Sequence, residues 1–159
     1  MPDDIADLIR TEHERIRELF TLLRPEEAHD PDALRQAWTE VADLLQVHLD
    51  AAEEIGCPPV LARADSIPRR RAEMTADHGD IRDAVYAARF HPVASRGWRL
   101  AVGTAQAAAM RHIDLFDTTL LDQIRHHLSQ RARKELGRQW RAFAVARALD
   151  AGEEREHDD

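Results

Sequence analysis

Residues 5–23 read IADLIRTEHERIRELFTLL, and the spacing of their apolar side chains decides the fold class. Apolar residues recur three and four positions apart, which is the period of one face of an α-helix. They are Ile5, Leu8, Ile9, Ile16, Leu19, Phe20 and Leu23. Asp3 or Asp4 can cap the start of this helix, and Pro25 disfavours helical backbone at Arg24. The segment therefore predicts a helix with one buried face.

Similar apolar patterns follow along the chain. Asp30 and Pro31 give a start signal for a second helix, and Gly56 with the Pro58-Pro59 pair ends it. A loop to about Pro68 is expected next. A third helix is then predicted over about 69–90, a turn over 91–97, a fourth helix over about 98–128 and a further helical segment over about 129–149. No segment has the alternation typical of a strand.

Short connections between long amphipathic helices favour antiparallel neighbours. We therefore expect an all-α protein, an antiparallel up-and-down four-helix bundle with an additional C-terminal helix. The expected domain spans residues 1–149, with a core over 4–128 and the C-terminal helix over 129–149. The charged residues 150–159 are expected to form a disordered acidic tail.

The bulk properties exclude several classes of function. The 159 residues suit one domain, and a formal net charge of −8 does not favour binding to nucleic acid or to anionic lipid. No apolar run is long enough to span a bilayer and no signal peptide is evident, so we expect a cytoplasmic protein. The single cysteine, Cys57, excludes an internal disulfide and a multi-cysteine zinc site.

Each of the four predicted bundle helices places one histidine on its apolar stripe. They are His13, His48, His78 and His112. Each lies three or four positions from apolar residues of its own helix, as His13 does from Ile9 and Ile16, so each should point into the core. A single inward histidine is usually an ordinary core residue. Four at matching depth indicate a shared metal site, because buried imidazoles need partners.

Two of these histidines are followed by a carboxylate at the fifth position, Glu53 after His48 and Asp117 after His112. The two halves of the chain thus repeat: one helix carries a lone histidine and the next carries histidine with carboxylate. This arrangement suits two metal ions bridged by carboxylates better than one. Imidazole and carboxylate without thiolate point first to iron, with manganese or zinc as alternatives.

The sequence resembles the hemerythrin-like family of HHE cation-binding domains over roughly Ile5 to Leu128. The resemblance is carried by the segments IADLIRTEHERI, VHLDAAEE, MTADHGDI and MRHIDLFD. It implies a four-helix bundle with a non-haem di-iron centre. It also implies that the four histidines are terminal ligands of the two irons, and that Glu53 and Asp117 bridge them.

The chain departs from the family pattern at two positions. The family usually places the carboxylate four residues after the second-helix histidine, where this chain has Ala52, and Glu54 is a second candidate beside Glu53. Met74 occupies the position of a further third-helix histidine, for which Glu73 is a weak substitute. A centre short of one ligand has an open position, which suits chemistry with exogenous ligands.

Three functions remain open at this point. The first is binding or sensing of dioxygen, nitric oxide or a related small ligand. The second is an enzyme that uses peroxide or oxygen, either to break down peroxide or to oxidise a small substrate. The third is a metal-free helical interaction module. The sequence does not distinguish the first two, and it does not reveal the oligomeric state.

Overall fold

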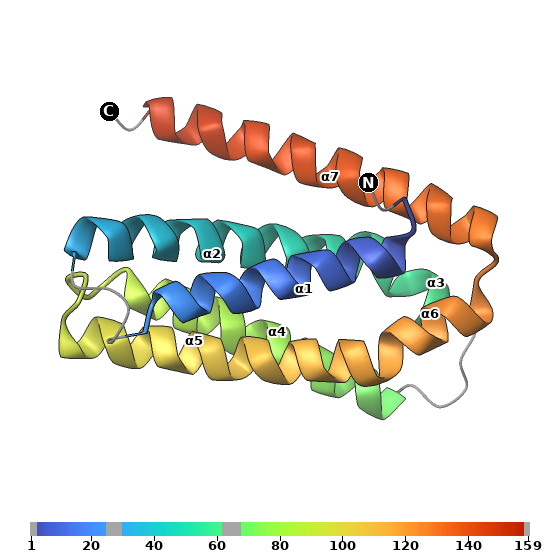
Figure 1. Ribbon diagram of the computed structural model, residues 1–159, viewed down its shortest axis with the longest axis horizontal. Coiled ribbons are helices and arrows are strands. Elements are labelled where there is room, and N and C mark those ends of the chain that lie inside the picture. Colours follow the sequence, from blue (N-terminus) through green and yellow to red (C-terminus); the bar gives the residue numbers. More distant parts are fainter. Residues whose placement is uncertain (1–2, 25–29, 62–67, 158–159) are drawn as a thin grey trace.

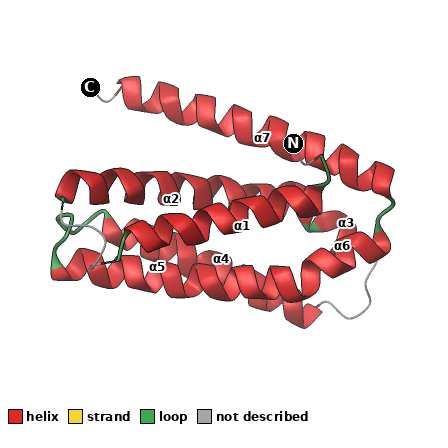
Figure 2. Cartoon of the chain, in the orientation of Figure 1, coloured by secondary structure: helices red, strands yellow, loops and turns green. Residues whose placement is uncertain are grey.

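The structure, a computed structural model, describes residues 3–24, 30–61 and 68–157, and in this part of the chain every regular element is a helix (Figure 1). The elements are α1 Ile5–Leu22, α2 Pro31–Ala51, η1 Ala52–Gly56, α3 Pro58–Leu61, α4 Pro68–Ala88, α5 Arg96–Leu115, η2 Phe116–Leu120, α6 Leu121–His127 and α7 Gln130–His157. Figure 2 shows helices and loops but no strand among these residues. The expected all-α class is confirmed. None of the helices described is both long and apolar enough to cross a membrane.

The helices begin where the sequence supplies a side-chain cap. The Asp4 carboxylate accepts a hydrogen bond from the backbone N–H of Ala6 at 3.0 Å, and Asp30 accepts one from Asp32 at 3.1 Å. Ser95 accepts from the backbone N–H of Trp98 at 3.2 Å at the start of α5. Each cap satisfies a backbone donor that the first helical turn leaves without an intrahelical partner.

Several boundaries differ from the expected ones. A short helix, Pro58–Leu61, lies where we expected only loop, because proline fits the first turn of a helix. The last helix continues past Leu149 to His157, through alanine and glutamate residues of high helix propensity. Residues 62–67 of the expected loop and 158–159 of the expected tail lie outside the described residues.

Two helices are each continued by one π-helical turn at an equivalent place. The segment η1 follows α2 and begins four residues after His48, and η2 follows α5 and begins four residues after His112. At the end of η1 the backbone N–H of Cys57 donates to the carbonyl of Ala52 at 2.9 Å, a bond that spans five residues. A π turn accommodates an extra residue in the helix and occurs most often at functional sites. The two turns carry Glu53 and Asp117.

The bundle core is divided into two apolar clusters by a layer of histidine. All four inward histidines are buried, each with at most 1% of its surface exposed. In α1, for example, His13 lies between Ile9 of one cluster and Ile16 of the other, and in α4 His78 lies between Met74 and Ile81 in the same way. The polar layer therefore crosses the core at one level, with apolar packing on both sides.

The last helix, α7, lies outside the other long helices, with its first half beside the start of α1 (Figure 1). It contacts α1, α2 and η1 and inserts Trp140, which is 1% exposed, into the second apolar cluster. A side chain at Gly137 would place its Cβ only 2.1 Å from the carbonyl oxygen of Asp3. Glycine at this position is therefore what allows α7 to approach the N-terminal segment so closely.

Candidate metal centre

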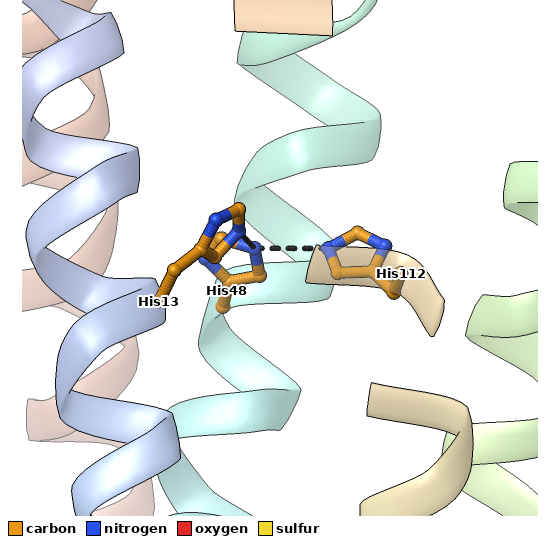
Figure 3. A group of neighbouring side chains, drawn as sticks. All are labelled: His13, His48 and His112. Atoms are coloured by element: carbon orange, nitrogen blue, oxygen red, sulfur yellow. Dashed lines mark hydrogen bonds between the residues drawn. The ribbon is translucent and has the colours of Figure 1, made fainter. Parts of the chain in front are cut away.

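Imidazole nitrogens from three helices converge at the middle of the histidine layer (Figure 3). The Nε2 atom of His48, from α2, lies 3.2 Å from Nε2 of His13 and 3.1 Å from Nε2 of His112, which come from α1 and α5. One nitrogen from each of the three side chains lies within 4.8 Å of the others. Nitrogen ligands at about 2.0–2.1 Å from a tetrahedral ion are about 3.3 Å apart, so two of the three spacings suit a single ion.

The fourth histidine, His78 of α4, borders this group. The centroid of its ring lies 4.8 Å from that of His112. Its Nε2 is buried and has no hydrogen-bond partner among the described residues, and the same holds for Nδ1 of His112. Buried polar nitrogens without partners are rare in proteins and mark a site that another group can complete.

Carboxylates fix the outward nitrogens of three of the histidines. Asp117 lies 2.8 Å from Nδ1 of His13, Glu12 lies 2.7 Å from Nδ1 of His48, and Glu53 lies 2.7 Å from Nδ1 of His78. An ionised carboxylate can only accept a hydrogen bond, so each Nδ1 carries the proton. Each Nε2 then carries a bare lone pair, the form in which imidazole binds a metal.

These tautomers leave a deficit of protons at the centre of the layer. His13 and His48 both donate from Nδ1, so their Nε2 lone pairs face one another at 3.2 Å with no proton between them. His112 can donate one hydrogen bond to Nε2 of His48, but only by leaving its own buried Nδ1 as an acceptor without a partner. A cation among the three Nε2 atoms would satisfy the lone pair that each of them carries, so the residues present fit a metal ion.

Burial also favours the neutral form of three of the imidazoles, those of His13, His78 and His112, as metal binding requires. It lowers the pKa of His13 to about 4, although the hydrogen bond to Asp117 partly opposes the shift. Burial likewise lowers the pKa of His112 well below its ordinary value and lowers that of His78. At neutral pH a metal ion therefore would not compete with protons for these nitrogens.

An arginine completes each of two matching carboxylate clamps. Arg17 donates to Asp117 at 2.9 Å, and Arg82 donates to Glu53 at 2.9 and 3.1 Å. Hydrogen bonding to Arg82 lowers the pKa of Glu53. Burial raises the pKa of Asp117, but hydrogen bonds from His13 and Arg17 outweigh it, so that this pKa also lies below its ordinary value. Both carboxylates are therefore anions at neutral pH.

The two clamps are related by the repeat in the sequence. Residues 13–17 read HERIR and residues 78–82 read HGDIR, so each lone histidine is followed four positions later by the arginine of its clamp. Arg17 and Arg82 were not predicted from the sequence, although the shared H-x-x-I-R pattern was a signal for them. The spacing places histidine and arginine on one face of the same helix.

Glu12 and Trp140 also belong to the site and were not foreseen: Glu12 contacts His48, and the indole N–H of Trp140 donates to Glu12. Glu12 directly precedes His13, and the equivalent residue before His78 is Asp77. Asp77 accepts from Arg111 at 3.2 Å rather than from His112, whose Nδ1 has no partner among the described residues. The repeat is therefore broken at this point. Glu12 holds Nδ1 of His48, whereas no described residue holds Nδ1 of His112.

The sequence-based candidates occupy four kinds of position. The four histidines form the buried layer, and Glu53 and Asp117 contact the Nδ1 atoms of His78 and His13. Their coordination of metal remains a prediction. Glu54 and Glu73 are exposed, while Met74 is buried with its Sδ 3.4 Å from Sγ of Cys57.

Comparison with known families agrees with this geometry. The model of the hemerythrin HHE cation binding domain matches residues 4–135, which is most of the chain. In the searches of curated proteins and of solved structures, nothing matches this chain. The match extends over α1 to the start of α7 and includes all four buried histidines. The chain belongs to the hemerythrin HHE cation-binding family.

Proposed function

We propose that this chain is a non-haem iron protein whose histidine-rich centre binds a small ligand such as dioxygen or nitric oxide. The observation that carries the proposal is the convergence of Nε2 atoms from His13, His48 and His112, whose lone pairs the surrounding protein donors cannot all satisfy at once. Family membership supports a metal cation there. We also propose that α1, α2, α4 and α5 form the antiparallel up-and-down bundle favoured by their short connections.

The donor set supports iron first, with manganese or zinc as alternatives, because imidazole and carboxylate suit these ions and no thiolate takes part. We propose that His13, His48 and His112 hold the first ion. The sequence predicts a di-iron centre. We propose that a second iron would be held by His78 with Glu53 and Asp117. In the proposal these two carboxylates turn from the Nδ1 atoms toward the metal. When bound, the iron supplies an open coordination position for the exogenous ligand.

The surroundings of the centre favour a ligand of very few atoms. The ring of Phe116 packs on His112, His13 and His48, with centroid distances of 4.7, 5.7 and 6.4 Å. Beside Phe116 there is a cavity of about 10 Å³. Its lining is apolar apart from one thiol and consists of Gly56, Cys57, Val60, Phe116, Leu120 and Ile124. A volume of roughly 10–15 Å³ holds one water molecule. The four histidines do not line this cavity, but Phe116 separates it from them, and its size admits a diatomic ligand rather than an organic substrate.

The chain's own residues set the conditions for binding. Before metal binds, Asp117 and Glu12 keep His13 and His48 in the tautomer that presents Nε2, and the buried layer excludes bulk water. A site without bulk water strengthens every electrostatic interaction inside it. Reversible ligand binding is proposed ahead of turnover, and the peroxide-using or oxygen-using enzyme is the alternative that the experiment below separates.

The test is purification after iron supplementation, followed by metal analysis and absorption spectra under argon, air, nitric oxide and peroxide. The proposal predicts bound iron and spectral changes that reverse when the gas is removed. Sustained peroxide consumption would favour the enzyme instead. A His48→Ala, His112→Ala double variant should lose its iron, whereas His126→Ala, at an exposed histidine of α6, should keep it. Absence of bound metal after reconstitution would end the proposal.

A further inference from the structure

The C-terminal helix reaches the candidate metal centre through one buried side chain. The indole N–H of Trp140 donates to Oε1 of Glu12 at 2.8 Å. The other oxygen of the same carboxylate, Oε2, lies 2.7 Å from Nδ1 of His48. The Trp140 ring also packs edge-on against the His48 imidazole, with centroids 5.5 Å apart and planes at 67°. The Glu12 carboxylate thus joins α7 to a histidine of the three-nitrogen group.

Ion pairs and close packing between α7 and the bundle fix the position of Trp140. Arg133 donates to Asp4 at 2.6 Å and Arg141 donates to Asp3 at 3.0 Å, so ion pairs flank the indole along α7. A Cβ atom at Gly56 would lie 3.1 Å from the Trp140 ring, which shows how closely the indole approaches η1. Because interiors are closely packed, Trp140 has little freedom to move away from Glu12.

We propose that α7 is a working part of the metal site, with Trp140 as a positioning residue that acts through Glu12 on His48. The side chain of Glu12 is 22% exposed, so without the indole it could rotate toward solvent. Held by Trp140, it keeps the proton of His48 on Nδ1 and the lone pair on Nε2. Docking of α7 and binding of metal then strengthen each other, because coupling between two equilibria is reciprocal.

The half of the centre that α7 does not reach supplies an internal comparison. His112 is the counterpart of His48, yet its Nδ1 has no partner among the described residues and Asp77 is held by Arg111. α7 therefore makes the two halves of a repeated site unequal, since it fixes the tautomer of His48 alone. This inference rests on the proposed metal binding, and it names a role for a helix that the four-helix arrangement does not require.

The variants that test it change hydrogen bonding with little change in volume. In Glu12→Gln the amide offers only one accepting oxygen, so either Trp140 or His48 loses its partner. In Trp140→Phe the aromatic packing is kept and the N–H is removed. The matched control is Glu14→Gln, at an exposed position of the same helix.

The experiment is a calorimetric titration of the metal-free full chain with Co²⁺, combined with hydrogen exchange over residues 136–144 with and without Co²⁺. Both test variants should bind Co²⁺ roughly 10–100-fold more weakly than wild type and the control, as other outer-sphere changes do. Exchange in α7 should slow on Co²⁺ binding in wild type and remain unchanged in Glu12→Gln. This second readout needs only wild-type protein if a variant fails to fold.

The outcomes separate this inference from the proposed function. The role of α7 is overturned if wild type and both variants bind Co²⁺ with equal affinity and exchange in α7 does not slow. The proposed metal site would then still stand. Wild-type protein that binds no Co²⁺ would overturn both. Weaker binding confined to the two test variants supports the coupling.

Discussion

The Nδ1 atom of His13 lies 2.8 Å from Oδ1 of Asp117, a residue 104 positions further along the chain. The contact joins α1 to the π turn η2, and its counterpart joins His78 of α4 to Glu53 of η1 at 2.7 Å. In both cases the carboxylate approaches the nitrogen that faces away from the three-nitrogen group. The π turns thus carry the acidic side chains that orient imidazoles of neighbouring helices.

Replacing Asp117 by asparagine should weaken metal binding. The amide cannot keep the negative charge that pairs with Arg17, and it favours the Nδ1 proton of His13 less strongly than a carboxylate does. We expect the affinity for Co²⁺ to fall roughly 10–100-fold in a calorimetric titration. Asp122→Asn, at an exposed position of α6, is the control and should match wild type. Equal affinities in all three proteins would contradict this role.

The metal-free protein should lose stability as the pH falls from about 6.5 to about 4. The pKa of His13 is lowered by burial to about 4 in the folded state, whereas an unfolded histidine titrates near its ordinary value of 6.5. Between these values the unfolded chain binds the extra proton, so acidification favours unfolding. The loss from His13 alone is on the order of 3 kcal/mol, and His78 and His112 act in the same direction. Urea unfolding at several pH values measures it, and a flat profile would refute it.

Phe116→Ala should destabilise the fold strongly, because it leaves a cavity beside the histidine layer. The ring is 1% exposed and packs on three imidazoles. Truncation of a buried phenylalanine costs roughly 3–5 kcal/mol. Phe90→Ala is the matched control, since this ring is 67% exposed and its loss should change the free energy of unfolding by no more than about 0.5 kcal/mol. Similar urea midpoints for the two variants would show that Phe116 does not pack as described.

Two glycine-to-alanine changes should have opposite effects on stability. At Gly137 the new Cβ would lie 2.1 Å from the Asp3 carbonyl oxygen, so α7 must shift and the variant should be less stable than wild type. At Gly103, inside α5, nothing lies within 4 Å of the added atom. Alanine there should stabilise the helix by about 0.5–1 kcal/mol. Thermal unfolding measures both effects. A Gly137→Ala variant as stable as wild type would argue against the close packing of α7 on the N-terminal segment.

The helices and the buried histidines could be predicted because a helix that buries one face carries a regular period in its sequence. His13, His48, His78 and His112 all lie on that period, and all are buried. Asp4, Asp30 and Ser95 cap helices through local hydrogen bonds. Asp30 was predicted as a helix start for that reason, and Asp4 was one of two candidates, with Asp3, for the first helix.

The contacts around the histidines could not be predicted in the same way. The π turns were not foreseen, because one extra residue in a turn leaves little trace in the apolar pattern. Glu12 was overlooked because its role depends on α7, which is distant in the sequence. Glu53 and Asp117 were expected to reach the metal, and their contacts with Nδ1 of His78 and His13 depend on how the helices pack.

Anaerobic titration of the metal-free protein with Fe²⁺, with bound iron counted per chain, measures whether the histidine layer holds a metal ion. We expect tight binding in wild type, loss of binding in a variant with His13, His48 and His112 all changed to alanine, and retention in His126→Ala. A wild-type chain that takes up no iron, or a triple variant that binds as much as wild type, would contradict it.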